Sequence, residues 1–273
     1  MPSYLINLYK SQISIKIIMA EYNLPNEKGR NRFEAYLGRK TEQMPKLIAD
    51  GRVPISVAGL MQRRLDVRNY DDKIKSQWIN NSFDTGDAVV YHPDNRIKIV
   101  LDSQHLRDMT PDTLKHYGAL ILIEEDIYNS LEGEEFKRDK IGKMGEWLSK
   151  KDVKSHPIWK SLARDQSLLN DYADYIFEEG KERFDYDFFM GVFPDPRFDE
   201  YIKMRVWCVT GLENMVSALG GRNLDNIDGC LLGIAPEAYT MADLQEVDKT
   251  IKRLEGTLHP DVLKPFVDLR KKL

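Results

Sequence analysis

The stretch SFDTGDAVVYHPDNRIKIVLDS, residues 82–103, has the clearest local structure in the chain. Two runs of mostly β-branched and aromatic residues, 88–92 and 96–101, flank Pro93-Asp94-Asn95. Asp and Asn tolerate the positive φ that a tight turn requires, and such runs are typical of strands. The stretch therefore predicts a β-hairpin over residues 87–102.

The loop length decides the pairing register of this hairpin. With Asp94-Asn95 as a two-residue loop, Val90 faces Ile99 and one face of the hairpin is mostly apolar. A shift by one residue would place Val90 opposite Lys98 and mix apolar with charged side chains, which a half-buried strand avoids. We therefore expect the two-residue loop.

The expected register also brings acidic side chains together. Asp87 lies opposite Asp102, where like charges destabilise a ladder, so either both diverge into solvent or a positive charge lies between them. A third strand, expected at residues 117–123 parallel to 96–101, would bring Glu124 to the same end. Asp87, Asp102 and Glu124 are therefore candidate catalytic residues and candidate ligands of Mg²⁺ or Mn²⁺, which prefer oxygen ligands. Such a metal would activate water for phosphoester hydrolysis.

Two local resemblances fall in the same stretch. Asp84-Thr85-Gly86 resembles the catalytic triplet of aspartic proteases, but the chain has no second copy to complete an acid dyad. Residues 83–100 resemble the Thr-Gly-Asp hairpin of acyl-adenylate-forming enzymes, in which Asp87 would hold a ribose. No Ser/Thr/Gly-rich phosphate loop accompanies it, so we interpret this second resemblance as a common hairpin pattern.

Composition indicates an ordinary globular protein. The chain has 273 residues, 42% of them hydrophobic and 31% charged, enough for one large or two small domains. Its two cysteines, Cys208 and Cys230, exclude a disulfide scaffold and predict a reducing compartment, the cytoplasm. The longest apolar runs are too short to cross a bilayer, so we expect no membrane partner.

Charge is distributed unevenly along the chain. Residues 1–70 hold 12 Lys and Arg against 6 Asp and Glu, whereas the remainder holds 28 against 38. This asymmetry favours an anionic partner for the first part. We therefore expect a basic helical region at 1–82 and an α+β body at 83–273, which ends in a helical hairpin formed by 240–254 and 260–269.

The basic region contains a possible helix-turn-helix within residues 47–65. Helical patterns at 28–50 and 57–65 are separated by a short turn that contains Gly51, the arrangement that reads DNA in many proteins. A plain helical hairpin with an apolar core explains the pattern equally well. If DNA or RNA is the partner, the candidate nucleic-acid-binding residues are Arg52, Arg63, Arg64 and Arg68.

Two further segments bear on structure and function. Residues 157–180 begin with a proline suited to a first helical turn and carry one apolar face, so they predict a long helix. A polar helix is expected at 127–151. The aromatic-rich segment 184–198 is expected to be core or the contact surface of a protein partner, and stacking on bases is the less common alternative.

No strong catalytic motif is present. The chain contains no HExxH, Walker A, G-x-S-x-G or G-x-G-x-x-G pattern. We predict an α+β protein, predominantly helical, with a small mixed β-sheet around the hairpin at 87–102. Three functions stay open: a binding protein associated with nucleic acid, a Mg²⁺- or Mn²⁺-dependent phosphoester hydrolase, and a protein-interaction or structural component. Binding ranks above catalysis because catalytic motifs are missing.

Overall fold

The structure is a computed structural model that describes residues 32–122, 124–137, 145–185, 187–194, 200–235 and 251–252. The helical hairpin expected at 240–254 and 260–269 lies outside the described residues, apart from 251–252, which are helical.

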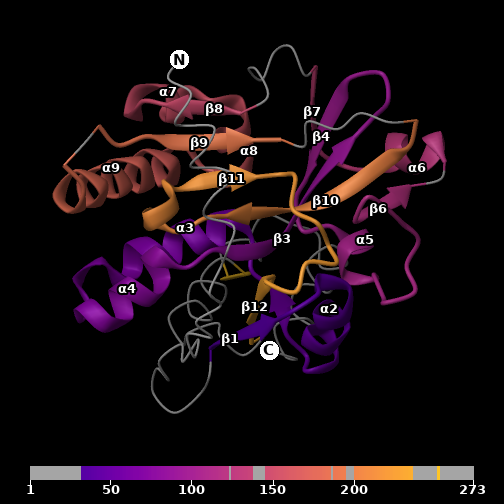
Figure 1. The fold of residues 1–273 in the computed structure, drawn as a ribbon, viewed down its shortest axis with the longest axis horizontal. Coiled ribbons are helices and arrows are strands. Elements are labelled where there is room, and N and C mark those ends of the chain that lie inside the picture. The colour runs from indigo at the N-terminus through magenta and orange to yellow at the C-terminus, as the bar shows by residue number, and fades with distance from the viewer. Residues whose placement is uncertain are drawn as a thin grey trace.

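The helices and strands alternate along the chain (Figure 1). The strands are β1 (Phe33–Leu37), β2 (Val53–Pro54), β3 (Phe83–Tyr91), β4 (Arg96–Val100), β5 (Lys115–His116), β6 (Ala119–Leu122), β7 (Glu134–Lys137), β8 (Glu146–Leu148), β9 (Met190–Phe193), β10 (Ile202–Val209), β11 (Ser217–Leu219) and β12 (Cys230–Ile234). The α-helices are α2 (Lys40–Ala49), α3 (Val57–Asp66), α4 (Asp72–Asn80), α5 (Gln104–Arg107), α6 (Glu125–Ser130), α7 (Lys150–Ser155), α8 (Pro157–Ala163) and α9 (Gln166–Arg183), and the 3₁₀ turns are η1 (Val67–Asn69) and η3 (Leu212–Asn214).

All twelve strands of the described residues belong to one mixed sheet. Its main path runs β1-β12-β3-β10-β11-β9-β8, and β4, β6, β5, β7 and β2 join it at the side. The pairs β12–β3 and β11–β9 are parallel, and the other pairs are antiparallel. Strands β1 and β2 pair with β12, so segments on both sides of the expected boundary at 82/83 share this sheet.

The prediction of a predominantly helical protein with a small sheet is wrong. The segment expected as a helix at 28–50 contains β1, and the one at 127–151 contains α6, β7 and β8. Short strands that are buried on both faces, or that lie at a sheet edge, lack the alternation that marks a strand in sequence. Such strands were therefore interpreted as helix or loop.

Helices cover both faces of the sheet, which creates two apolar cores. All nine residues of β3 and all eight of β10 are buried. Along β3, Val89 and Tyr91 point into the core beneath α3, α4, α7, α8 and α9, whereas Ala88 and Val90 point into the core beneath α2, α5 and α6. The central strands are therefore apolar on both faces, as expected for a sheet enclosed between helical layers.

The hairpin formed by β3 and β4 exists as predicted, but its register is shifted by one residue. Val90 pairs with Lys98 and Ala88 pairs with Val100. The loop has three residues, because the His92 amide donates to the Arg96 carbonyl at 2.9 Å and Asn95 takes the positive φ of 72°. This register, which places Val90 opposite Lys98, is tolerated because the Lys98 ammonium donates to the backbone carbonyls of Tyr128 and Leu131.

The third strand is not where the sequence placed it. β6 pairs antiparallel with β10 and β5, and β4 pairs with β7 instead. The predicted long helix at 157–180 is also two helices, α8 and α9, because Arg164 adopts a left-handed conformation with φ of 64°.

Candidate functional site

Asp87 and Asp102 lie close together, and a positive charge bridges them. Arg164 Nη2 lies 2.7 Å from Asp87 Oδ1, and Arg164 Nη1 lies 2.9 Å from Asp102 Oδ2. Asp87 is fully buried and also accepts the backbone amides of Val57 and Asp102. The left-handed residue that ends α8 therefore fastens the helical layer to the base of the hairpin.

Burial raises the pKa of Asp87 above the ordinary value of a carboxyl group, although the amides of Asp102 and Val57 and the charge of Arg164 act in the opposite direction. A carboxyl group whose pKa is raised by folding contributes its stability below the unfolded pKa, and this contribution is lost as the pH rises through the folded pKa. The two amides and the Arg164 guanidinium are the groups that favour the ionised form of Asp87 in the folded protein.

We expect Arg164→Ala to lower the free energy of unfolding by about 2 kcal/mol at pH 7, less than for a fully buried pair because Arg164 is partly exposed and two amides remain. Alanine keeps a Cβ at the same φ, so backbone strain is unchanged. The loss should shrink as the pH falls towards 3.5, because protonation of Asp87 removes the charge that Arg164 faces. Urea unfolding at pH 7 and pH 3.5 measures it.

The control for this experiment is Arg107→Ala, which removes a guanidinium 3.7 Å from the exposed acid Asp102. We expect this variant to lose less than about 0.5 kcal/mol at either pH. An Arg164→Ala loss that is independent of pH would show that the charge of Asp87 is not its cause.

Glu124 does not join the other two acids. Glu124 lies directly before α6, and the first residue of α6, Glu125, contacts His92 at the turn end of the hairpin. Asp87 and Asp102 lie at the opposite end of the hairpin. Across the described residues, no group of three or more His, Cys, Asp or Glu side chains could hold a metal ion. The three carboxylates expected to bind Mg²⁺ or Mn²⁺ are thus separated because β6 pairs with β10 and not with β4.

The four arginines expected to contact nucleic acid have different surroundings. Arg63 is buried, with its guanidinium over the rings of Phe33 and Trp78 at 5.0 Å each. Arg64 is fully buried, Arg52 is paired with a glutamate at 3.0 Å, and Arg68 is exposed.

Helices α2 and α3 are not arranged as a helix-turn-helix. β2 lies between them, and α2 packs on one face of the sheet whereas α3 packs on the other. The helix expected to read DNA is a core helix, because its apolar side chains are buried, Arg64 donates to buried acceptors and Arg63 lies over aromatic rings.

The aromatic-rich segment 184–198 is partly core, as far as it is described. Phe188 packs against Gly180 of α9, and Met190 and Val192 are buried in β9. Residues 195–199 and 186 lie outside the described residues. The role of this segment as the contact surface of a protein partner stays a prediction.

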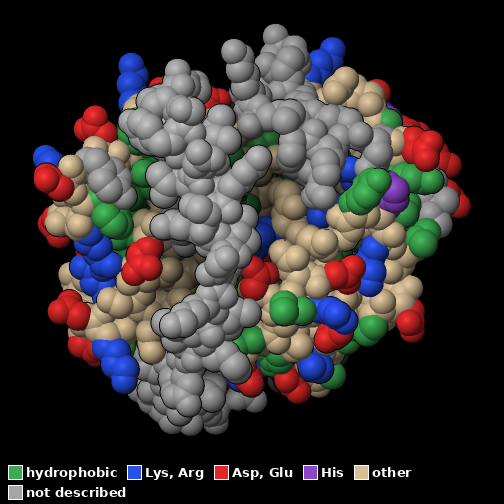
Figure 2. Space-filling view, in the orientation of Figure 1, with side chains coloured by type: hydrophobic (Ala, Val, Ile, Leu, Met, Phe, Trp, Pro, Cys, Tyr) green, Lys and Arg blue, Asp and Glu red, His purple; other side chains and the backbone are tan. Residues whose placement is uncertain are grey.

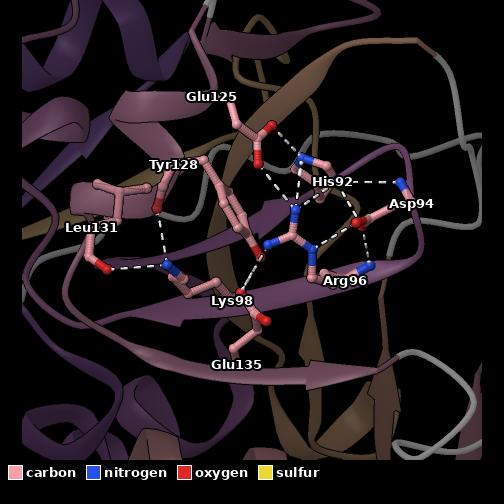
Figure 3. A network of polar contacts seen from close by, with 8 residues as sticks. All are labelled: His92, Asp94, Arg96, Lys98, Glu125, Tyr128, Leu131 and Glu135. Atoms are coloured by element: carbon pink, nitrogen blue, oxygen red, sulfur yellow. Dashed lines mark hydrogen bonds and ion pairs between the residues drawn. The ribbon is translucent and has the colours of Figure 1, made fainter.

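A network of charged side chains surrounds the hairpin turn (Figure 3). His92 Nδ1 lies 2.6 Å from Asp94 Oδ1, and His92 Nε2 lies 2.7 Å from Glu125 Oε2. Arg96 reaches both acids, at 2.7 and 3.1 Å. The hydrogen bond from His92 is the main cause that lowers the pKa of Glu125. The network ties the turn to α6.

A second turn, between β5 and β6, displays an aromatic side chain in a strained conformation. Tyr117 and Gly118 form a two-residue loop with φ of 48° and 67°, the signs of a type I′ turn. Gly118 is required, because a Cβ there would lie 1.7 Å from the Asn223 side chain. No comparable steric requirement explains a tyrosine at position 117. Its side chain is 64% exposed, and an L-residue at positive φ costs roughly 1–2 kcal/mol.

A buried arginine in β10 holds the backbone of this turn in place through hydrogen bonds. Arg205 is fully buried in β10, and its Nη2 donates to the Tyr117 carbonyl at 2.7 Å. Its Nη1 donates to the carbonyls of Gly118 at 3.2 Å and Arg222 at 3.0 Å. The backbone that carries Tyr117 is thus held rigidly by the body of the sheet.

Aliphatic and aromatic side chains are exposed around this turn. The ring of His116 lies 4.3 Å from that of Tyr117 and 4.8 Å from that of Tyr201. Leu114 is 56% exposed and Tyr201 is 39% exposed. We define the Tyr117 surface as these four residues. In Figure 2, hydrophobic side chains and a histidine gather where Figure 1 places β6, and acidic side chains lie beside them where it places α6.

The sequence contained only a weak signal for this surface. The pair Tyr117-Gly118 was interpreted as the start of a strand because an apolar run follows it. The glycine at the second loop position is the one local clue to a turn. No local pattern predicts Arg205 beneath the turn, because it lies 88 residues from Tyr117 along the chain.

Comparisons with known proteins give one structural likeness. No protein-family model matches the chain, and no curated protein matches it. A solved structure described as "Accommodation of massive sequence variation in Nanoarchaeota by the C-type lectin fold" superposes with a TM-score of 0.58 at 10% sequence identity. The match covers 76% of this chain and 100% of that chain. At this identity the likeness shows the fold, one of the C-type lectin kind, and the site residues must be argued from their own geometry. No helix among the described residues has the length and apolar character needed to cross a membrane.

Proposed function

We propose that the protein is a binding protein whose contact surface is the Tyr117 surface. The observation that carries this proposal is Tyr117 itself, an exposed aromatic residue at positive φ on a turn clamped by buried Arg205. Strained backbone in an otherwise well-packed protein clusters at functional sites, where the local cost is retained for function. Tyrosine supplies a large, rigid, amphipathic contact area, which makes it common in binding surfaces.

The fold is consistent with this role. The matched structure is described as a C-type lectin fold that accommodates massive sequence variation, so this kind of scaffold tolerates changes in its residues. In the present chain the rigid part is the sheet, and the Tyr117 turn projects from it. We place the protein in the cytoplasm, because both cysteines are free and buried.

The strain makes a prediction that separates a functional from a structural role for Tyr117. Asparagine tolerates positive φ, and Asn-Gly is the favoured type I′ pair, so Tyr117→Asn should raise the free energy of unfolding by about 1 kcal/mol. The melting temperature should rise by roughly 2–4 °C. A residue kept for stability would give the opposite sign, because its loss would destabilise the protein.

Tyr70→Asn is the matched control. Tyr70 is 43% exposed but has a φ of −81°, so asparagine relieves no strain there and should not stabilise. Thermal and urea unfolding of both variants measure the difference. A destabilised Tyr117→Asn variant would contradict the strain argument.

Binding itself is tested by placing the photoreactive residue p-benzoylphenylalanine at position 117 or at position 70 and irradiating the native cells. Discrete cross-linked species at 117 that are missing at 70 are the expected result. Equal labelling at both positions, or none at either, would refute the Tyr117 surface as a contact site.

A further inference from the structure

The charges around the Tyr117 surface indicate what kind of partner it takes. Lys115 lies beneath it but pairs with Asp225 at 3.1 Å, and Arg222 lies 3.7 Å from Asp228. Arg205 is committed to three backbone carbonyls. Among the described residues, these three cations are thus already ion-paired or buried, which leaves them poorly suited to bind phosphate groups.

The charge of the chain is also unfavourable for a polyanion. The 44 Asp and Glu outnumber the 40 Lys and Arg, which gives a net charge of −4. Because the described cations near Tyr117 are paired or buried, a polyanion bound there would release few counterions. Nucleic acid is therefore electrostatically mismatched to this surface.

The loop formed by residues 222–229 adds an exposed apolar side chain next to the Tyr117 surface. The Leu224 amide donates to the Gly118 carbonyl at 2.8 Å, which holds residues 222–229 against the turn. Ile227 on this loop is 67% exposed. Exposed aliphatic and aromatic side chains, combined with charges paired among themselves, match the core of a protein–protein interface.

We propose that the Tyr117 surface binds an apolar, uncharged peptide segment of another protein, with Tyr117 as the central anchor. The proposal rests on the binding function proposed above and adds the chemistry of the partner. Because the turn is held rigid before binding, little ordering cost is incurred when the partner arrives. The interaction should depend on apolar contact and only weakly on salt.

A displayed library of random 12-residue peptides provides a defined probe. Peptides selected on the full-length wild-type protein, with no counter-selection against any variant, should be rich in Leu, Ile, Phe, Trp or Tyr and poor in charge. Their dissociation constants should change by less than about threefold between 50 and 500 mM NaCl. Tyr117→Asn and Tyr201→Ala should each weaken binding at least about tenfold, as expected at a hot spot, and Tyr70→Asn should not.

Other outcomes separate this proposal from the one it rests on. Selected peptides that are strongly charged, or binding lost at 500 mM NaCl, would overturn the apolar partner while retaining Tyr117 as a contact. If the protein binds single-stranded DNA or RNA and Tyr117→Asn abolishes that binding, Tyr117 remains a contact residue but the apolar partner is overturned in favour of nucleic acid. Selected peptides that bind all variants equally, or a selection that yields no binders, would remove both proposals.

Discussion

Replacing Arg64 by leucine is expected to lower the free energy of unfolding by about 5 kcal/mol, a large share of the stability of an ordinary domain. Arg64 is fully buried and donates to three backbone carbonyls and one hydroxyl. The acceptors are Trp78 O at 2.9 Å, Tyr172 Oη at 2.7 Å, Asn81 O at 2.9 Å and Thr210 O at 3.1 Å. Each buried acceptor left without a donor costs about 1–3 kcal/mol.

The four acceptors belong to different parts of the fold, which explains the size of the effect. They come from α4, the loop before β3, α9 and the end of β10, so Arg64 of α3 joins the helical layer to the sheet. Lysine has three donors on one nitrogen and cannot copy the fork of a guanidinium, so Arg64→Lys should lose about 3 kcal/mol.

Arg68→Leu serves as the control for this experiment. Arg68 is exposed one turn further along, and its loss should change stability by less than about 0.5 kcal/mol. Urea unfolding measures all three variants, and soluble yield reports on Arg64→Leu if it does not fold. A wild-type-like Arg64→Leu would show that the buried guanidinium is not needed.

Replacing Lys40 by methionine is expected to lower the free energy of unfolding by about 3 kcal/mol. Lys40 Nζ lies 3.2 Å from Asp84 Oδ2, and both side chains are fully buried. Removal of one partner leaves a buried carboxylate without its counter-charge, which costs about 3–5 kcal/mol in comparable pairs. The lower value applies because the Cys230 amide still donates to Asp84 at 3.0 Å and Arg222 Nε lies 3.9 Å away.

The neighbouring residue provides a matched control. Arg39 pairs with Glu42 at 3.2 Å, but both side chains are about half exposed, so Arg39→Met should cost less than about 1 kcal/mol. The double variant Lys40→Met/Asp84→Asn should be more stable than the sum of the two single losses predicts, because no uncompensated charge remains. Additive losses would contradict a direct interaction between Lys40 and Asp84.

The hairpin shows how far local sequence information reaches. Its strands and turn were predictable, because β-branched residues and Pro-Asp-Asn act within a few residues of one another. Its register was not predictable, because the carbonyls of Tyr128 and Leu131 that satisfy Lys98 come from 30 and 33 residues further along. The bridge over Asp87 and Asp102 was foreseen as one of two alternatives. That the positive group is Arg164 could not be foreseen.

The basic first part shows the opposite case. The charge excess of residues 1–70 predicted an anionic partner, yet Arg63 and Arg64 are buried in the core. A count of charges does not distinguish a solvated arginine from one that satisfies buried carbonyls. The large sheet is not predictable for a different reason. Its short edge strands have no hydrophobic alternation that would mark them as strands.

By itself, the sequence determined the hairpin, the class of mixed α and β structure, and the positions of several helices, because propensity, capping and turn chemistry act locally. Tertiary structure alone decided the register, the separation of Glu124 from Asp87 and Asp102, and the buried roles of Arg64, Lys40 and Arg205. It also decided that Tyr117 stands exposed on a clamped turn. Each of these depends on partners brought together by strand pairing across long sequence separations, and no local pattern encodes such pairing.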